Sequence, residues 1–321
     1  MPSAQHPTAA HPAPRSLPAP IEPPIGPPMN PPIDRYAVLG HPVAHSQSPF
    51  IHAAFARQTG QVLHYGRIDC PLDAFEPTLR GWVDSAGAAD GCGPVRGCNI
   101  TVPFKFQVLP LARHVTPRAR LAQAANTLRI AADADGAPAW TADNTDGIGL
   151  VRDLQDHAGL PLAGLRVLLI GAGGAAAGVL GPLMAAGCAG ITVTNRTVAR
   201  AHLLLQRHQA LADQHRVAVQ ATSLDHCGSG FDVVINSSAS SLEGGPVPVP
   251  GSVLRPGALA VDLMYGPAAQ PFLAWAAQHG AIGRDGLGML VEQAAEAFLL
   301  WRGVRPATAP VLAALRARLQ G

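Results

Sequence analysis

The stretch Leu165-Arg-Val-Leu-Leu-Ile-Gly-Ala-Gly-Gly-Ala-Ala176 decides the fold of this 321-residue chain. Its first half is a largely apolar run typical of a buried strand, and its second half has the pattern G-x-G-x-x-A. In such a turn the first glycine permits a sharp change of direction, and the second lets backbone N–H groups approach a pyrophosphate. The N-terminus of the next helix then attracts the phosphates. The stretch predicts a dinucleotide site, with a plain strand-to-helix turn as the alternative. The expected contacts are Gly171, Ala172, Gly173, Gly174 and Ala175.

The next strand indicates which dinucleotide binds. An NAD enzyme usually presents Asp or Glu to the ribose 2′-hydroxyl about twenty residues after the glycines. Here the sequence reads Asn195, Arg196, Thr197, with Arg200 one turn later. Two guanidinium groups and a hydroxyl attract a 2′-phosphate through charge-assisted hydrogen bonds, which a carboxylate would repel. The segment therefore favours NADP, with an ordinary solvated helix start as the alternative.

Composition indicates a globular protein of two compact domains. The formal net charge of +2 is close to balance and no Lys/Arg run occurs, so nothing supports nucleic-acid binding. The 5 cysteines are odd in number and form no C-x-x-C pair, which favours a reducing cytoplasm over disulfides or a zinc site. The histidines show no metal-ligand pattern, so no metal is expected.

Two segments of unusual composition need separate interpretations. Residues 1–33 alternate Pro with Ala, Gly and single polar residues, which predicts a flexible tail. Residues 167–194 carry no charge and are long enough to span a bilayer. Because glycines and Pro182 interrupt this second run, we expect a strand, a turn and a packed helix instead of a membrane span.

Strands and helices alternate from Arg35 onward. We expect strands at residues 36–40, 62–68, 95–102, 127–132, 139–142, 165–170, 191–194, 231–236 and 258–264. We expect helices at residues 49–58, 75–86, 147–158, 175–186, 197–209, 271–279, 288–301 and 307–319, and a further one opening at Pro103. Asp135-Gly136 predicts a hairpin turn. The alternation predicts an α/β fold with parallel sheets in two layers or more.

Two serines follow the first expected strand. In the run His45, Ser46, Gln47, Ser48, Pro49, the second serine and the proline suit the start of a helix, with Ser48 as N-cap. Two hydroxyls beside a helix N-terminus also form a carboxylate site. The sequence leaves these two interpretations open.

A lysine and an aspartate are candidates for proton transfer. Asn99 and Thr101 share one face of a strand, and Lys105 lies in the first turn after Pro103, where the helix dipole disfavours a cation. A surface lysine is the alternative. Asp146 is the expected partner, with an N-cap as its alternative. Hydride transfer to a ketone builds negative charge on the oxygen, and such a pair can supply the proton without a metal.

Taken together, these motifs resemble the shikimate dehydrogenase family. The resemblance runs from about residue 36 to residue 315, nearly all of the chain except the tail. Its motifs are residues 45–49, 99–105, 125–127, 144–149, the glycine turn, residues 195–197, 262–265 and 285–293. It implies reversible, NADPH-dependent reduction of 3-dehydroshikimate to shikimate in aromatic amino-acid biosynthesis.

The resemblance also implies domains and residue roles. The substrate-binding domain is expected at residues 34–145 and 286–321, and a Rossmann-like NADP-binding domain at residues 146–285. Lys105 and Asp146 are implied as the catalytic pair, and Ser46 and Ser48 as the site of the substrate carboxylate. Recognition of substrate hydroxyls is implied for Asn99, Thr101, Asn126, Asp146 and Gln293, with Tyr265 nearby. Met289 is implied beside the nicotinamide, and Gly286 among the cofactor contacts.

Two rival functions remain at this point. A close relative acting on quinate or an amino-substituted shikimate, possibly with NAD, differs by only a few contacts to hydroxyl groups. A non-catalytic binding or regulatory protein would lack Lys105 or Asp146, and both are present. A small-molecule substrate is expected as the partner, with no membrane or nucleic acid, and the chain is expected to be a monomer or a homodimer.

Overall fold

The structure is a computed structural model that describes residues 33–85, 92–133, 135–136, 139–238 and 245–320. The predicted tail lies outside the described residues except for Ile33. That residue is the first of strand β1 (Ile33–Gly40), so the tail prediction extends one residue too far.

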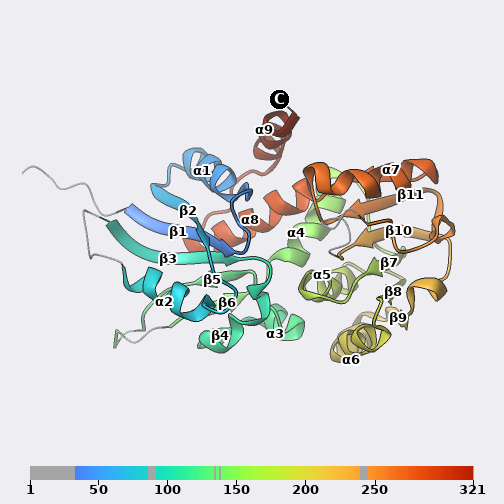
Figure 1. Cartoon of the computed structure of the whole chain (residues 1–321), viewed down its shortest axis with the longest axis horizontal. Coiled ribbons are helices and arrows are strands. Elements are labelled where there is room, and N and C mark those ends of the chain that lie inside the picture. Colours follow the sequence, from blue (N-terminus) through green and yellow to red (C-terminus); the bar gives the residue numbers. More distant parts are fainter. Residues whose placement is uncertain (1–32, 86–91, 134, 137–138, 239–244, 321) are drawn as a thin grey trace, which may run out of the picture. The chain divides into compact units, whose positions relative to one another are not determined.

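The first of two sheets is mixed. Its strands are β1, β2 (Leu63–Asp69), β3 (Cys92–Ile100), β4 (His114–Val115), β5 (Thr127–Arg129) and β6 (Thr141–Asp143). They lie in the order β2-β1-β3-β5-β6-β4 (Figure 1). β1 is parallel to both β2 and β3, whereas β5 is antiparallel to β3 and β6. The predicted hairpin is therefore confirmed, and the prediction of a parallel sheet holds for only part of this one.

The second sheet is entirely parallel. Its strands are β7 (Arg166–Ile170), β8 (Gly190–Thr194), β9 (Ala218–Thr222), β10 (Phe231–Asn236), β11 (Leu254–Asp262) and β12 (Ile282–Arg284). Their order, β12-β11-β10-β7-β8-β9, is that of a Rossmann fold, with the change of direction between β7 and β10. Ligands of such sheets bind outside the carboxyl ends of the strands at this switch point, which is where the glycine turn follows β7.

Nine α-helices occur in the described part of the chain. They are α1 (Ser48–Thr59), α2 (Phe75–Asp84), α3 (Pro117–Ala122), α4 (Asp146–Arg152), α5 (Gly174–Ala185), α6 (Val198–His215), α7 (Gln270–Gln278), α8 (Leu287–Arg302) and α9 (Ala309–Gln320). None of them has the length and apolar character needed to cross a membrane. The helix expected at Pro103 is absent, because two short 3₁₀ turns, Phe104–Phe106 and Leu109–Leu111, take its place.

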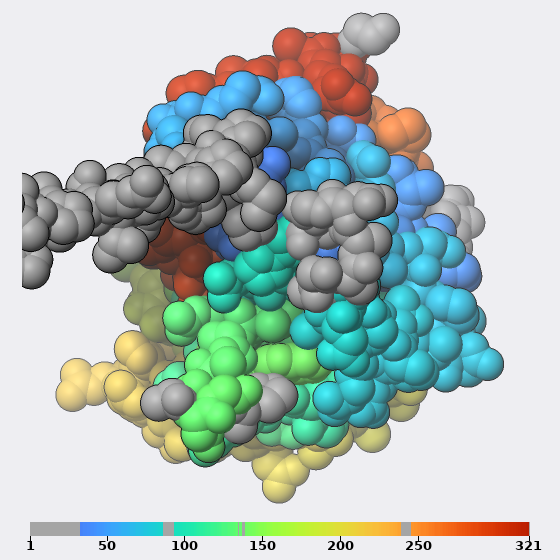
Figure 2. All heavy atoms as spheres, turned by 90° about the vertical axis from the view of Figure 1, so that its left-hand side faces the viewer, coloured from blue at the N-terminus to red at the C-terminus, as the bar shows by residue number. Residues whose placement is uncertain are grey.

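Side chains of β7 alternate between two cores. Val167 and Leu169 pack with α5 and α6 on one face, and Leu168 and Ile170 pack with α7 on the other. This explains why a strand buried on both sides reads as a continuous apolar run. On the first sheet α2 contacts β3, and Arg80 of α2 lies over the ring of Trp140, just before β6, at 5.4 Å. Figure 2 shows this side of the molecule, where cyan atoms lie beside green ones.

Glycines let α4 approach two other helices closely. A Cβ on Gly147 would overlap the carbonyl oxygen of Gly178 in α5. A Cβ on Gly149 would lie 2.7 Å from both the Cβ and the backbone nitrogen of Gln293 in α8. Helix α4 is thereby held between α5 and α8, and its first residue, Asp146, is fixed in position.

Replacement of Gly149 by alanine is expected to lower the free energy of unfolding by about 1–3 kcal/mol, because overpacking forces the two helices apart. Gly81→Ala is the matched control. A Cβ on Gly81, within α2, meets nothing within 4 Å, so alanine there is expected to be neutral or stabilising by up to about 1 kcal/mol. Denaturant unfolding of both variants measures the difference, and equal changes would contradict the proposed helix contact.

Candidate functional site

A partly buried ion pair joins the two candidate proton-transfer residues. Nζ of Lys105 lies 2.5 Å from Oδ2 of Asp146, and the two side chains are 17% and 6% exposed. Lys105 is thus no surface lysine. The N-cap of α4 is Thr145, so Asp146 is not the N-cap either. Because only a single 3₁₀ turn surrounds Lys105, the helix-dipole argument for its placement is wrong.

Lys105 is the only lysine of the chain, since the other 22 of its 23 lysine and arginine residues are arginines. Arginine stays protonated in proteins, whereas lysine can release its proton when its surroundings favour it. The single lysine of this chain therefore lies at the position that we consider for proton exchange. This signal was present in the sequence and strengthens the candidate.

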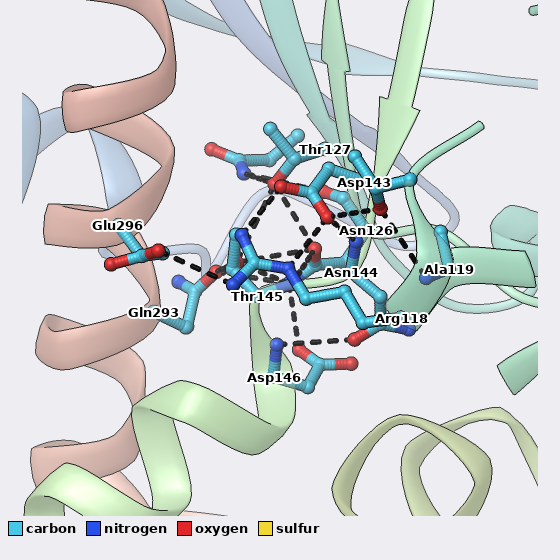
Figure 3. Close-up of polar contacts among 12 residues, drawn as sticks. Arg118, Ala119, Asn126, Thr127, Asp143, Asn144, Thr145, Asp146, Gln293 and Glu296 are labelled. Atoms are coloured by element: carbon cyan, nitrogen blue, oxygen red, sulfur yellow. Dashed lines mark hydrogen bonds and ion pairs between the residues drawn. The ribbon is translucent and has the colours of Figure 1, made fainter. Parts of the chain in front are cut away.

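Asn126 is the hub of the polar cluster around Asp146 (Figure 3). Its side-chain nitrogen donates to Oδ1 of Asp146 at 2.8 Å and to Oε1 of Gln293 at 3.2 Å. Its side-chain oxygen accepts from the backbone N–H of Thr145 at 2.8 Å. Asn126, Asp146 and Gln293, three predicted residues from different parts of the chain, are therefore joined by hydrogen bonds. Thr145, which sequence reasoning missed, completes the cluster.

Asn99 is held by a second residue that sequence reasoning missed. The Tyr65 hydroxyl donates to Oδ1 of Asn99 at 2.7 Å, and Asn99 donates to Oγ1 of Thr127 at 3.1 Å. Burial raises the pKa of Tyr65 well above its usual value, with the charge of Cys98 adding to the rise and a hydrogen bond to Ser48 opposing it. Tyr65 is therefore a phenol at neutral pH. The sequence contains only 3 tyrosines, and that scarcity was the one available signal.

Ser46 and Ser48 lie together at the start of α1. The Ser46 hydroxyl donates to Oγ of Ser48 at 3.2 Å, and it accepts the backbone N–H of Ser48 at 3.3 Å. The helix begins at Ser48, and Gln47 is its N-cap, so the N-cap prediction for Ser48 is wrong. The paired hydroxyls expected of a carboxylate site are present.

Tyr265 lies beside these serines, whereas Thr101 has no hydrogen bond to the polar cluster within the described residues. Burial raises the pKa of Tyr265, while a hydrogen bond with the backbone of Gln47 and the charge of Arg67 oppose the rise. The methyl group of Thr101 packs against Gly40, and its hydroxyl has no hydrogen bond within the described ranges. The structure therefore does not join Thr101 to Asn99.

The glycine turn has the geometry of a phosphate-binding turn. Gly171 has a φ of +109°, which suits glycine, and its N–H donates to the carbonyl oxygen of Thr194 in β8 at 2.8 Å. A Cβ on Gly173 would meet nothing within 4 Å, so open space adjoins the start of α5. The first backbone N–H groups of that helix have no acceptor within it. Ala172 and Ala175 are partly buried beside them.

The turn also lies next to the lysine. A Cβ on Gly174 would lie 3.4 Å from the Phe106 ring and 3.8 Å from Cβ of Lys105. A dinucleotide held by the turn therefore passes close to the segment that carries the proton-transfer candidate.

Asn195, Arg196, Thr197 and Arg200 lie between the carboxyl end of β8 and the start of α6. The side-chain nitrogen of Asn195 donates to the carbonyl oxygen of Thr197 at 2.9 Å. Arg196 and Arg200 are exposed, and neither guanidinium has an ion-pair partner within the part of the chain that the structure describes. Their positive charge is available to an anion at the end of this strand.

The last two cofactor candidates lie at the start of α8. Gly286 is the N-cap of this helix, and a Cβ there would overlap the carbonyl oxygen of Leu263. Met289 is buried and packs in the core beneath the second sheet.

The chain matches three family models. The shikimate dehydrogenase substrate-binding domain matches residues 38–128. Shikimate/quinate 5-dehydrogenase matches residues 154–243, and the shikimate 5′-dehydrogenase C-terminal domain matches residues 286–316.

Proteins similar to this chain include shikimate dehydrogenases. The shikimate dehydrogenase (NADP(+)) of Methylibium petroleiphilum is 62% identical over 90% of this chain and 96% of its own length. The crystal structure of an Ael1 enzyme from Pseudomonas putida is 42% identical, with a TM-score of 0.77, over 88% of this chain and 98% of that one. The Thermus thermophilus shikimate 5-dehydrogenase in complex with NADP(H) and shikimate is 34% identical, with a TM-score of 0.71, over 89% of this chain and 100% of that one.

Proposed function

The chain belongs to the shikimate dehydrogenase family, and we propose that it catalyses the reversible, NADPH-dependent reduction of 3-dehydroshikimate to shikimate. The observation that carries this proposal is the Lys105–Asp146 pair, surrounded by buried amide and hydroxyl groups and lying next to the dinucleotide turn. The reaction consumes one ketone, one hydride and one proton, and it yields one secondary alcohol.

The residues that follow the strands of the second sheet fit NADP. The open space at Gly173 and the unpaired amides of α5 suit a pyrophosphate, and Arg196 and Arg200 suit a 2′-phosphate. Gly286 and Met289 complete the site. When bound, NADPH supplies the hydride that adds to the carbonyl carbon of the substrate.

Lys105 supplies the proton. Its ammonium group donates to the carbonyl oxygen as negative charge builds there, so that an alcohol forms instead of an alkoxide. Asp146 holds the ammonium group, and Asn126 holds Asp146 through its other carboxylate oxygen. In the reverse direction neutral Lys105 accepts the proton of the alcohol.

We assign substrate recognition to the polar groups around this pair. Ser46 and Ser48 bind the carboxylate through their hydroxyls and the N-terminus of α1. The hydroxyls of the substrate are recognised by Asn99, Thr101, Asn126, Asp146 and Gln293, with Tyr265 beside the carboxylate. Tyr65 orients Asn99.

The two sheets support different functions for two parts of the chain. We assign substrate binding to residues 34–145 and 286–321 and cofactor binding to residues 146–285. The described thiols of Cys70, Cys98, Cys188 and Cys227 are unpaired and buried, which supports a cytoplasmic site of action. A monomer or a homodimer remains the proposed assembly.

Product identification tests the proposed reaction. Incubation of the purified protein with NADPH and 3-dehydroshikimate is expected to yield shikimate and NADP in equal amounts, as measured by NMR. Oxidation of NADPH without shikimate formation would overturn the proposal.

Replacement of Arg196 by alanine tests the cofactor assignment. Loss of one charged contact to the 2′-phosphate is expected to cost about 1.5–3 kcal/mol, which corresponds to a rise of roughly 10- to 150-fold in KM for NADP. KM for NAD is expected to change little. Arg207→Ala, an exposed arginine further along α6, is the control and is expected to leave both values unchanged. Equal effects of Arg196→Ala on NADP and NAD would remove the 2′-phosphate from this site.

A further inference from the structure

Arg118 binds two carboxylates at the edge of the site without touching the lysine. It lies on α3, and its Nε and Nη2 donate to the two carboxylate oxygens of Asp143 at 2.7 and 2.5 Å. Its Nη1 donates to Oε1 of Glu296 on α8 at 3.2 Å. The side chain of Asp143 is 2% exposed and that of Arg118 is 26% exposed, so the bidentate pair is partly buried. Figure 3 shows Arg118 between Asp143 and Glu296.

Asp143 connects Arg118 to the catalytic segment. Its Oδ1 accepts the backbone N–H of Asn144 at 2.7 Å, and its carbonyl oxygen accepts the backbone N–H of Asn126 at 3.0 Å. Oδ1 of Asn144 in turn accepts the backbone N–H of Asp146 at 3.1 Å. Asp143 therefore contacts the segment next to Asp146 through its carboxylate, and it contacts Asn126 through its own backbone carbonyl.

Glu296 connects Arg118 to the other side of the site. It lies one turn after Gln293 on α8, so both side chains project from nearly the same face of that helix. Glu296 also accepts a hydrogen bond from Arg305 at 3.0 Å, which holds its second oxygen. Arg118 thus bridges the segment that carries Asp146 and the helix that carries Gln293.

We propose that Arg118 is a positioning residue for substrate. Through Asp143 and Glu296 it sets the distances among Asn126, Asp146 and Gln293. It is not a catalytic residue, because within the described part of the chain its hydrogen bonds go to these two supporting carboxylates. The inference rests on the proposed function, since the positioned groups are those assigned to the hydroxyls of shikimate. An arginine is needed because only a guanidinium group binds one carboxylate at two points and a second carboxylate at a third.

Because the carboxylate of Asp143 must be ionised to bind Arg118, the positioning role of Arg118 predicts a pH dependence. Burial raises the pKa of Asp143, but the hydrogen bonds and charge of Arg118, with bonds from Thr116 and Asn144, outweigh burial and hold it below the ordinary value. The ionisable groups facing the carboxylate are Arg118 from α3 and, beyond it, Glu296 from α8. Without Arg118 the effect of burial remains, so the pKa of Asp143 rises. Its carboxylate is then lost as the pH falls through that raised value.

The test compares Arg118→Ala with Arg302→Ala in the full-length protein. Arg302 pairs with Asp34 at the far end of β1, and its side chain is 19% exposed. We expect Arg118→Ala to raise KM for shikimate by about 10- to 100-fold, because misplacement by about 1 Å has effects of that size. KM for NADP is expected to stay unchanged. Arg302→Ala is expected to leave both KM values at the wild-type level.

Two further readouts separate positioning from general stability. Millimolar guanidinium chloride is expected to lower the raised KM of Arg118→Ala and to have no such effect on Arg302→Ala. The value of kcat/KM for Arg118→Ala is expected to fall more steeply than that of wild type as the pH is lowered, because without Arg118 the carboxylate of Asp143 becomes protonated at a higher pH than in wild type.

Two milder variants keep the proposal testable if Arg118→Ala does not fold. Arg118→Lys keeps the charge but not the two-point geometry. Glu296→Gln removes the negative charge that pairs with Arg118 and Arg305, and it leaves the pair of Arg118 with Asp143 in place. Each is expected to raise KM for shikimate at least 3-fold, with KM for NADP unchanged. Wild-type KM for shikimate in all folded Arg118 and Glu296 variants would overturn the inference. If the proposed function is wrong, the wild-type protein does not oxidise shikimate. That result is distinct from a failure of the role proposed for Arg118.

Discussion

Replacement of Lys105 by alanine is expected to lower kcat by about 100- to 10,000-fold, the range that a positioned acid or base contributes. KM for shikimate is expected to change little, because the carboxylate and hydroxyl contacts assigned to other residues remain. Steady-state rates of NADP reduction at saturating shikimate measure the loss. The physical reason is that no other ammonium group exists in the chain outside its N-terminus, since Lys105 is the only lysine.

Lys105→Arg is the matched variant for charge. Arginine retains the positive charge beside Asp146, but it does not release a proton near neutral pH. We therefore expect Lys105→Arg to be nearly as slow as Lys105→Ala. Substantial activity of the arginine variant would mean that charge alone suffices and that proton transfer by Lys105 is not needed. Unchanged turnover of the alanine variant would remove Lys105 from the mechanism.

Replacement of Asp146 by asparagine is expected to lower kcat by about 100-fold or more and to raise KM for shikimate. The amide keeps the shape and can still accept from Asn126, but it removes the negative charge that holds the Lys105 ammonium group. Loss of this charged hydrogen bond is also expected to lower the free energy of unfolding by roughly 1.5–3 kcal/mol. Steady-state kinetics and denaturant unfolding measure the two effects.

Asp232→Asn is the control for the loss of an ion pair. Asp232 pairs with Arg255 and accepts the backbone N–H of Arg166. These contacts lie at the amino ends of the central strands β7 and β10, opposite the carboxyl end where the glycine turn follows β7. This variant is expected to lose stability without losing turnover. A kcat for Asp146→Asn close to that of this control would reduce Asp146 to a structural residue.

The second sheet was predictable because its signals are local. The apolar run before Gly171 reads as a strand buried on both faces, and the glycine pattern marks the turn. Strands β9 and β12 were missed. β12 is short and largely exposed, and β9 has little continuous apolar character, so neither stands out from a loop.

The sequence suggested candidate residues for the site, but it did not indicate their geometry. Local rules indicated N-caps at Ser48 and Asp146, whereas the caps are Gln47 and Thr145. The hub at Asn126 depends on contacts with Asp146 and Gln293, which are distant in sequence, and no local pattern encodes them. The helix expected at Pro103 does not form. Only one 3₁₀ turn surrounds Lys105, whose carbonyl oxygen accepts the backbone N–H of the distant Ala125 at 2.8 Å.

The most direct test is the initial rate of NADP reduction by the purified protein with shikimate, measured beside quinate and repeated with NAD. We expect fast turnover with shikimate and NADP, and much lower kcat/KM when either is replaced. Preference for quinate or NAD would contradict the assigned substrate or the role of Arg196 and Arg200. No turnover with any pair would contradict catalysis by Lys105 and Asp146 altogether.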